Sequence, residues 1–249
     1  MLLDRQFLQD NIRGECVLAA TWNVQWAAKK NREEIAARLA SLNADVLVVT
    51  EAVRSVLPSQ GFIADAGSDW GYRVTDAERR KVIMWSRYPL SDLSTHDDLD
   101  MPRGRLIGAT CHLPTGPLRI MGVCIPWKDA HVGTGRKDAS AWSEHLHFLS
   151  ALGTLISERE RTLPAVVLGD FNQRIPSRGA PKPVFDSLRE TLGDLQVVSA
   201  DDVPGLTHQA IDHIAISIDL SATEVFGIPR SGSDGRALSD HDLVAARFS

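Results

Sequence analysis

The chain has few cysteines, and none is placed to build a structural centre. Cys16, Cys111 and Cys124 are the only three, and no two of them form a Cys-x-x-Cys pair. Each lies in an apolar run that looks like a strand. This pattern argues against a disulfide-stapled scaffold and against a thiolate-bound zinc domain. We therefore expect buried free thiols in a reducing compartment.

Long apolar runs are also absent. No stretch approaches the roughly 20 residues that a transmembrane helix needs. The N-terminus begins Met-Leu-Leu-Asp-Arg, and the acidic Asp4 is unsuited to the start of a signal peptide. We expect a cytoplasmic protein with no membrane partner.

An excess of basic residues is missing as well. Lys and Arg number 27 against 32 for Asp and Glu, so the formal net charge is −5. This balance argues against a protein that coats nucleic acid through bulk electrostatics. It leaves a nuclease open, because a metal ion and a local basic rim can neutralise a few phosphates.

The chain does have enough apolar sequence for a self-supporting core. Of its 249 residues, 43% are hydrophobic and 24% are charged, which is ordinary for a globular protein. No internal repeat, low-complexity tract or linker divides it. We expect one domain over residues 1–249, and we favour a monomer.

Short runs rich in Val and Ile, bounded by Gly, Pro, Asp or Ser, predict strands along the whole chain. The candidates are residues 16–21, 45–50, 82–86, 106–111, 118–125, 165–169, 211–217 and 243–248. The sequence Pro-Thr-Gly-Pro separates the fourth candidate from the fifth. It favours a tight turn, so these two strands should form an antiparallel hairpin.

Three segments predict helices. Asn31 and Glu34 resemble a capping box that opens the first helix. The second helix is predicted over residues 138–158 and the third over residues 183–190. The apolar stripe of the second helix is Trp142, Leu146, Leu149 and Ile156. Two largely antiparallel sheets sandwiched by a few helices fit this order of elements.

Polar residues with metal or proton chemistry recur where apolar strands begin or end. They are Asn23, Glu51, Asp170, Asn172, Asp212, Asp240 and His241. Taken singly, each could be a turn or cap residue. Strand ends gather functional groups from distant parts of a sequence, and a carboxylate beside a buried strand requires a partner or a cation. Their joint occurrence therefore favours a site.

These residues lie in segments that resemble the endonuclease/exonuclease/phosphatase superfamily, which includes exonuclease III-type apurinic endonucleases and DNase I. The segments are residues 21–24 (Thr-Trp-Asn-Val), 44–51, 82–90, 169–172 (Gly-Asp-Phe-Asn), 211–214 (Ile-Asp-His-Ile) and 239–241 (Ser-Asp-His). The resemblance covers nearly the whole chain. It implies an α/β fold, namely a four-layered α/β/β/α sandwich of two mixed, largely antiparallel sheets.

The resemblance also implies a role for each residue. Glu51 would be the main Mg²⁺ ligand, helped by Asn23 and Asp240, with Mn²⁺ able to substitute. The remaining four would be catalytic: Asp170 would deprotonate the attacking water, Asn172 would donate its amide to the phosphate, and His241, oriented by Asp212, would stabilise transition-state charge. Hard oxygen ligands of this kind suit Mg²⁺ better than zinc.

Three positions depart from the family pattern. Gln25 stands where apurinic endonucleases usually have Asn or Asp, and Thr50 replaces a common Gln. Cys124 stands where the family usually has a Tyr or His that binds phosphate. A thiol is a poor phosphate ligand, and the apolar neighbours of Cys124 provide no base that would make it a nucleophile.

Basic loops follow two of the predicted strands and could form a substrate rim. The candidate substrate-binding residues are Lys128, His131, Arg136, Arg174 and Arg178, with Trp127 as a stacking surface for a base and His208 facing the pocket. Each of them could equally be an ordinary surface or turn residue. A phosphate-rich substrate would need such a rim.

Three functions remain open on the sequence. The first is a divalent-metal phosphodiesterase that acts on nucleic acid as an endo- or exonuclease. The second is a phosphomonoesterase for a small phosphorylated molecule, such as a nucleotide or inositol phosphate. The third is a catalytically silent binding protein, which is disfavoured because all seven residues of the motif set are present.

Overall fold

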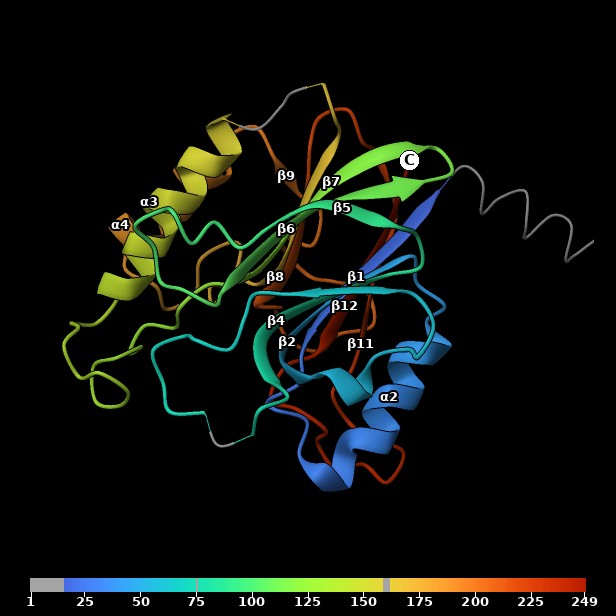
Figure 1. Cartoon of the computed structure of the whole chain (residues 1–249), viewed down its shortest axis with the longest axis horizontal. Coiled ribbons are helices and arrows are strands. Elements are labelled where there is room, and N and C mark those ends of the chain that lie inside the picture. Colours follow the sequence, from blue (N-terminus) through green and yellow to red (C-terminus); the bar gives the residue numbers. More distant parts are fainter. Residues whose placement is uncertain (1–15, 75, 159–161) are drawn as a thin grey trace, which may run out of the picture.

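The computed structural model describes residues 16–74, 76–158 and 162–249, so the expectation about Asp4 falls outside the described part. Two six-stranded sheets dominate it (Figure 1). The first sheet has the order β11-β12-β1-β2-β4-β3. Its strands are β1 (Val17–Asn23), β2 (Val46–Val53), β3 (Phe62–Asp65), β4 (Arg79–Ser86), β11 (Ala222–Ile228) and β12 (Leu243–Phe248).

The second sheet has the order β5-β6-β7-β8-β10-β9. Its strands are β5 (Leu90–Ser94), β6 (Leu106–Leu113), β7 (Gly116–Cys124), β8 (Ala165–Asp170), β9 (Gln196–Val197) and β10 (Asp212–Ile216). Strands β6 and β7 form the expected hairpin, with Leu113 opposite Gly116. The pairs β1–β2 and β7–β8 are parallel, and the other pairs are antiparallel.

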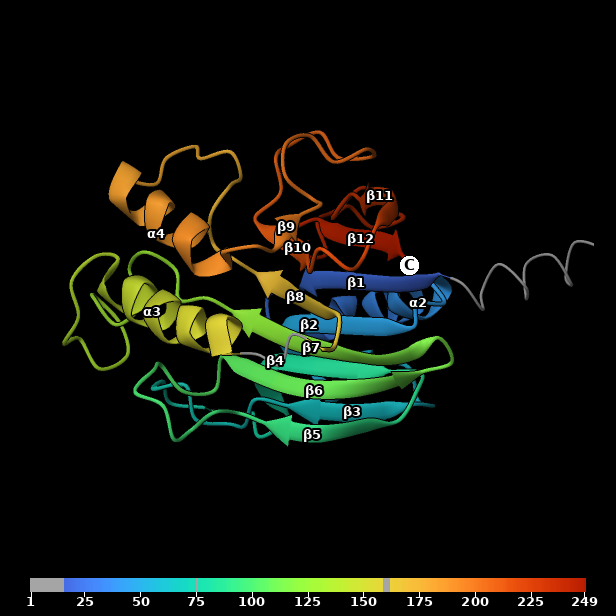
Figure 2. The same ribbon diagram turned by 90° about the horizontal axis from the view of Figure 1, so that it is seen from above.

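In the described residues, three α-helices cover the outer faces of the sheets. Figures 1 and 2 show α3 (Ser143–Glu158) and α4 (Lys182–Leu192) on one side and α2 (Arg32–Ser41) on the other. Short 3-10 turns at Lys29–Asn31 and Arg54–Val56 flank α2 and β2. The predicted four-layered α/β/β/α sandwich is therefore confirmed.

Three apolar clusters hold the four layers together. The middle cluster fills the space between the sheets. Val48 packs closely over Gly122 there, since a Cβ at Gly122 would lie only 3.1 Å from the methyl groups of Val48. A second cluster packs α2 against the first sheet through Ile35 and Leu39. A third packs α3 and α4 against the second sheet through residues such as Phe148 and Leu188. Apolar burial of this extent is the main stabilising term of such a fold.

The first helix starts where it was predicted, whereas its capping box and the start of the second helix were predicted wrongly. Asn31 is the N-cap of α2 but makes no capping hydrogen bond; its Nδ2 donates to Leu238 O, and a Glu34 carboxylate oxygen accepts from Ser233 N. Helix α3 begins at Ser143 rather than at residue 138, because Trp142 adopts a left-handed φ of 70°.

The apolar stripe predicted for α3 is also shifted. Leu146 points outward and is 38% exposed. The buried face of the helix consists of His145, Phe148, Leu149, Leu152 and Ile156. A histidine therefore takes a core position that the sequence pattern assigned to an apolar residue.

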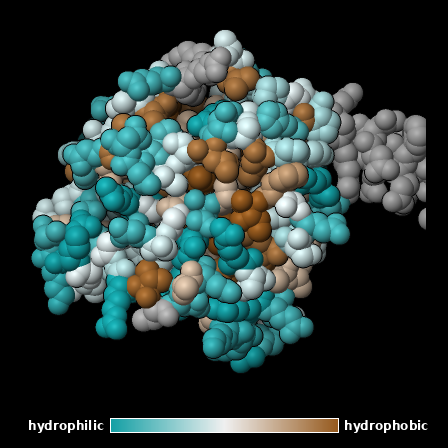
Figure 3. Space-filling model, viewed as in Figure 1, coloured by the Kyte–Doolittle hydropathy of each residue, from teal (hydrophilic) through white to brown (hydrophobic). Residues whose placement is uncertain are grey.

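The surface is largely hydrophilic on the face shown in Figure 3, with a hydrophobic strip across it. Among the described residues, exposed large apolar side chains on neighbouring strands β3 and β5 include Phe62, Ile63 and Leu93. No helix of the described chain is long and apolar enough to cross a membrane.

Candidate active site

A cavity of about 230 Å³ lies where strands of both sheets end. Its lining brings together six of the seven residues that the sequence analysis assigned to metal binding or catalysis. They are Asn23, Glu51, Asp170, Asn172, Asp240 and His241. The seventh, Asp212, is hydrogen-bonded to His241. The predicted motif residues therefore form one constellation.

Asn23, the last residue of β1, ties the first sheet to the second. Its backbone N–H donates to Asp212 Oδ1 at 3.0 Å, and its Nδ2 donates to Asp170 Oδ2 at 2.9 Å. The two carboxylates are each 1% exposed. Buried carboxylates need hydrogen-bond donors, so Asn23 fixes the positions of both.

Asp170 ends β8 and begins a tight turn. The backbone N–H of Asn172 donates to Asp170 Oδ1, and Asn172 Nδ2 donates to Asp170 Oδ2, both at 2.9 Å. Burial raises the pKa of Asp170 to about 7, opposed by the charge of His241 and assisted by that of Asp212. A carboxyl group that titrates near neutrality can accept a proton there.

The amide of Asn172 is already engaged within the protein. Besides its bond to Asp170, Nδ2 donates to Ile125 O at 2.9 Å. Asn172 also adopts a left-handed φ of 52°. The structure therefore brings Asn172 into the lining, and its side chain holds the turn in place.

Gly169 makes the approach of β8 to β7 possible. Its φ is 147°, and a Cβ at this position would lie 1.8 Å from Val123 O. No side chain can be accommodated so close to a backbone carbonyl. The Gly in Gly-Asp-Phe-Asn is thus required by packing, one residue before Asp170.

His241 faces the cavity from the loop before β12. Its Nδ1 lies 2.5 Å from Asp212 Oδ2, and its backbone O accepts from Trp22 Nε1 at 2.8 Å. Burial lowers the pKa of His241, but the charges of Asp212 and Asp170 outweigh this and raise it to about 10. The imidazole is therefore a cation near neutral pH, with Nε2 3.8 Å from Asp240 Oδ1.

Glu51 lies opposite Lys81 in the antiparallel pair β2–β4, since Thr50 pairs with Val82 and Ala52 with Arg80. Glu51 Oε1 is 2.5 Å from Lys81 Nζ. Glu51 has a left-handed φ of 48°, which is rare for a non-glycine residue inside a strand and is typical of functional sites.

Two cationic side chains of the lining were missed in the sequence. Lys81 and Arg105 are 7% and 2% exposed. Arg105 Nη1 donates to Cys124 O at 3.3 Å, whereas its Nε has no hydrogen-bond partner within the described chain. Only the strand pairing would have pointed to Lys81, because it lies opposite Glu51; no sequence signal singles out Arg105.

Cys124 lines the cavity but is fully buried. Burial raises the pKa of its thiol to about 12, so it is a thiol rather than a thiolate at neutral pH. Cys111 is buried beside Ser86, and Cys16 is half-buried rather than fully buried as expected.

The loop after β7 contributes only Trp127 to the cavity. Trp127 is 44% exposed at its mouth. His131 is buried and stacks on Tyr72 at 4.3 Å between ring centroids. Arg136 forms ion pairs with Asp138 and Glu144.

The other predicted rim residues lie on the surface and are not among the lining residues. Lys128 is exposed and 3.7 Å from Asp129, and Arg174, Arg178 and His208 are exposed. Whether they touch an extended substrate stays a prediction.

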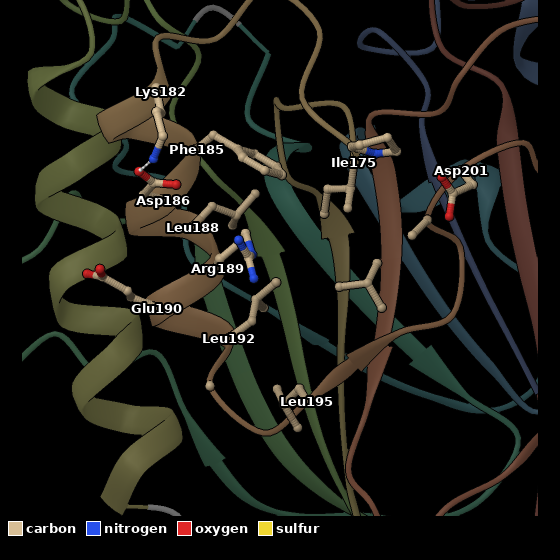
Figure 4. Close-up of a pocket in the computed structure, with 14 residues that line it drawn as sticks. Ile175, Lys182, Phe185, Asp186, Leu188, Arg189, Glu190, Leu192, Leu195 and Asp201 are labelled. Atoms are coloured by element: carbon tan, nitrogen blue, oxygen red, sulfur yellow. Dashed lines mark hydrogen bonds and ion pairs between the residues drawn. The ribbon is translucent and has the colours of Figure 1, made fainter.

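A larger hollow of about 980 Å³ lies beside α4 (Figure 4). Leu188 and Leu195 contribute apolar lining, and Lys182 pairs with Asp186 within α4. Its charged groups do not converge on one point. Size alone therefore does not make it the site of chemistry, and the smaller cavity is the candidate.

Comparisons with known proteins agree with this geometry. The Endonuclease/Exonuclease/phosphatase family matches residues 20–241. The chain belongs to this family. No curated protein matches the sequence.

Several solved structures share the family fold. The 3'-5' exonuclease NExo from Neisseria meningitidis is 19% identical, with a TM-score of 0.68, and the match covers 93% of this chain and 99% of that one. An AP endonuclease from Archaeoglobus fulgidus is 15% identical, with a TM-score of 0.66 and coverage of 92% and 98%. D. rerio TDP2 complexed with single-strand DNA product is 13% identical, with a TM-score of 0.65 and coverage of 94% and 99%.

Two neighbouring groups in this family site, with no residue in common, could hold a metal ion. Asp170, Asp212 and His241 each offer a ligand atom, and these atoms lie within 4.8 Å of one another. Glu51 and Asp240 face the same cavity with carboxylate oxygens, and Asn23 with an amide oxygen that also accepts from Gln25 N. The second group consists only of hard oxygen donors, and the near-neutral pKa of Asp170 marks a place where added positive charge is favourable. The residues present therefore fit a divalent cation.

Proposed function

We propose that this chain is a Mg²⁺-dependent phosphodiesterase that acts on nucleic acid. The observation that carries the proposal is the arrangement around one cavity of a buried carboxyl group that titrates near neutrality and an imidazolium paired with a carboxylate. Asp170 supplies the first, and His241 with Asp212 supplies the second. Phosphoester hydrolysis requires such a base and such a cation.

Asp170 would accept the proton of the water that attacks phosphorus. Asn23 and Asn172 orient its carboxylate, since both of their amides donate to Oδ2. His241, held at Nδ1 by Asp212, would donate a hydrogen bond from Nε2 to a phosphate oxygen. The charge on that oxygen grows in the transition state, so a fixed cation there lowers the barrier.

Glu51, Asp240 and Asn23 would hold the Mg²⁺ ion, and Mn²⁺ should substitute for it. A bound divalent cation supplies positive charge to the phosphate and the leaving oxygen. Lys81 pairs with Glu51 and remains beside the cavity, and Arg105 keeps an unpaired Nε in the lining. Both cations support anion binding by the same site.

Nucleic acid is the proposed substrate for two reasons. The solved relatives include TDP2 with a single-strand DNA product, and Trp127 offers an exposed ring at the mouth of the cavity. The alternative is a phosphomonoesterase for a small molecule. One observation favours it: Arg136 and Lys128 lie next to acidic partners, which weakens the predicted phosphate rim.

The test is hydrolysis by purified protein with Mg²⁺ or Mn²⁺ of plasmid, abasic duplex, single strands and a panel of phosphomonoesters. We expect cleavage of a nucleic acid that excess EDTA abolishes. Glu51→Gln should lower kcat by at least about a hundredfold, whereas the matched control Glu33→Gln, on the exposed face of α2, should not. Turnover of phosphomonoesters alone would establish the alternative, and full activity in EDTA would refute metal dependence.

A further inference from the structure

A second cavity, of about 260 Å³, adjoins the catalytic cavity. The two share Lys81, Arg105 and Trp127 in their linings. The second cavity therefore lies next to a substrate group bound at the catalytic cavity. The proposed function uses the three shared residues but assigns no ligand to the second cavity itself.

The walls of the second cavity are aromatic. Trp26 and Trp70 stack with their ring centroids 5.3 Å apart and an interplanar angle of 23°. The guanidinium of Arg79 and the ammonium of Lys81 lie 5.2 and 4.9 Å from the centroid of the Trp26 ring. Trp26 is thus held rigidly by its neighbours, and Trp127 is the ring that remains available for stacking.

The charged side chains of this cavity are all cationic, Arg73 among them, and Tyr72 and Thr134 add neutral polar groups. Arg79, Lys81 and Arg105 line it, and the lining contains no acidic residue among the described positions. The buried Nε atoms of Arg79 and Arg105 have no hydrogen-bond partner within the described chain. A cationic lining without an acidic residue favours a ligand that brings hydrogen-bond acceptors.

We propose that the second cavity is the subsite for the nucleobase next to the scissile phosphate. A base is planar, stacks on an indole ring and carries carbonyl and ring-nitrogen acceptors for the two guanidinium groups. An alkyl chain would leave the donors unmatched, and a polyphosphorylated polyol would leave the aromatic walls uncovered. The inference rests on the proposed function, and it assigns the nucleotide unit as the element that this protein recognises.

The test compares substrates that differ only in the base. Thymidine 5′- and 3′-(p-nitrophenyl phosphate) are each paired with the same ester of base-free 1,2-dideoxyribose, with Mg²⁺ present. For each pair, the kcat/KM of the thymidine ester is divided by the kcat/KM of the base-free ester. We expect this ratio to be about 10-fold lower in Trp127→Ala than in wild type for at least one pair. Trp127→Phe, which retains a ring, should keep most of the ratio. Phe62→Ala is the matched control, because Phe62 is exposed to 45% against 44% for Trp127 and lies on β3.

A binding measurement separates this inference from the proposed diesterase activity. Calorimetry with thymidine 5′-monophosphate and with deoxyribose 5-phosphate needs no turnover. If no diester is cleaved but the nucleotide binds at least about 10-fold more tightly, and Trp127→Ala removes the difference, the subsite stands without the diesterase. If diesters are cleaved with equal ratios in wild type and Trp127→Ala, the subsite assignment is overturned. Equal affinity for the two ligands, or no binding of either, overturns it as well.

Discussion

The segment 169–173 separates two groups of histidines that the protein holds in opposite protonation states. On the cavity side, His241 is a cation whose pKa is raised to about 10 by Asp212 and Asp170. Behind the segment, burial lowers the pKa of His145 and of His213 to about 4. All three rings are enclosed, so burial alone does not decide the charge. The neighbouring carboxylates do.

The hydrogen-bond partners of the two rear histidines are neutral, and for His213 burial outweighs the charge of Asp212. His145 Nδ1 donates to Pro126 O at 2.7 Å, and His145 Nε2 accepts from Gln173 Nε2 at 2.8 Å. His213 Nε2 donates to Gln173 O at 3.1 Å. These neutral rings lock the backbone on both sides of Asp170 without adding charge near it. The cavity side of the segment carries the proposed catalytic groups, and the rear side fixes the position of the backbone.

The largest loss of activity should come from substitutions on the cavity side. Asp170→Ala and His241→Ala should each lower kcat on an identified substrate by about a hundredfold or more, because they remove the base and the cation. Steady-state kinetics with circular dichroism as a folding check measures this. His147→Ala, on the exposed face of α3, is the control. Wild-type turnover by either variant would refute the role of that residue.

Gly169→Ala should damage both groups at once. A Cβ 1.8 Å from Val123 O forces β8 away from β7 at the residue before Asp170. We expect a loss of about 3 kcal/mol in the free energy of unfolding, together with lower kcat. Urea denaturation measures the first and kinetics the second. Gly133→Ala, where a Cβ meets nothing within 4 Å, should change neither, and equal behaviour of the two variants would contradict the explanation.

The rear histidines, His145 and His213, should affect how the free energy of unfolding depends on pH. The folded protein keeps His145 neutral down to about pH 4, whereas the unfolded chain protonates it near 6.5. The unfolded state therefore binds more protons in this window, and the free energy of unfolding falls as pH drops from about 6.5 to 4. The contribution to the slope is up to about 1.4 kcal/mol per pH unit. His145→Gln should reduce the slope in urea titrations and His147→Gln should not; identical slopes in all three proteins would rule out this source.

The smallest effect should be that of thiol alkylation at the boundary of the cavity. Cys124 is 1% exposed, and burial raises its pKa to about 12. Iodoacetamide at pH 7 should leave Cys124 unmodified by mass spectrometry and leave activity intact. Alkylation of Cys124 with loss of activity would show that the lining opens far more than the structure indicates.

The sequence predicted the inner strands of the sheets and missed the edge strands. All eight expected strands are interior, and β3, β5, β9 and β11 occupy the four edges. Edge strands are half-exposed, so they carry no continuous apolar run, as the pattern of β5, Leu-Ser-Asp-Leu-Ser, illustrates. A strand can be predicted from the sequence when it is buried, because burial requires a continuous apolar run.

The candidate site was likewise predictable only in part. Residues of the motif set were recognised because they lie in short, ordered segments, whereas Lys81 and Arg105 depend on which strands pair and which loops meet. Arg136 fails in the opposite direction, since a local charge run predicts a rim but Asp138 and Glu144 neutralise it. Charge pairing across a loop cannot be read from composition.

The hydrogen bonds from Asn23 join the two sheets across 147 residues to Asp170 and 189 residues to Asp212. On the side of the first sheet, Ser239 Oγ donates to Asn23 O across 216 residues. Each of these contacts closes a loop of more than half the chain, so we expect them to form late, after both sheets have assembled. The candidate active site therefore requires both sheets. A fragment that retains one sheet alone would carry only part of the site residues, even if it folded. During refolding, activity should therefore return only when the two sheets have docked.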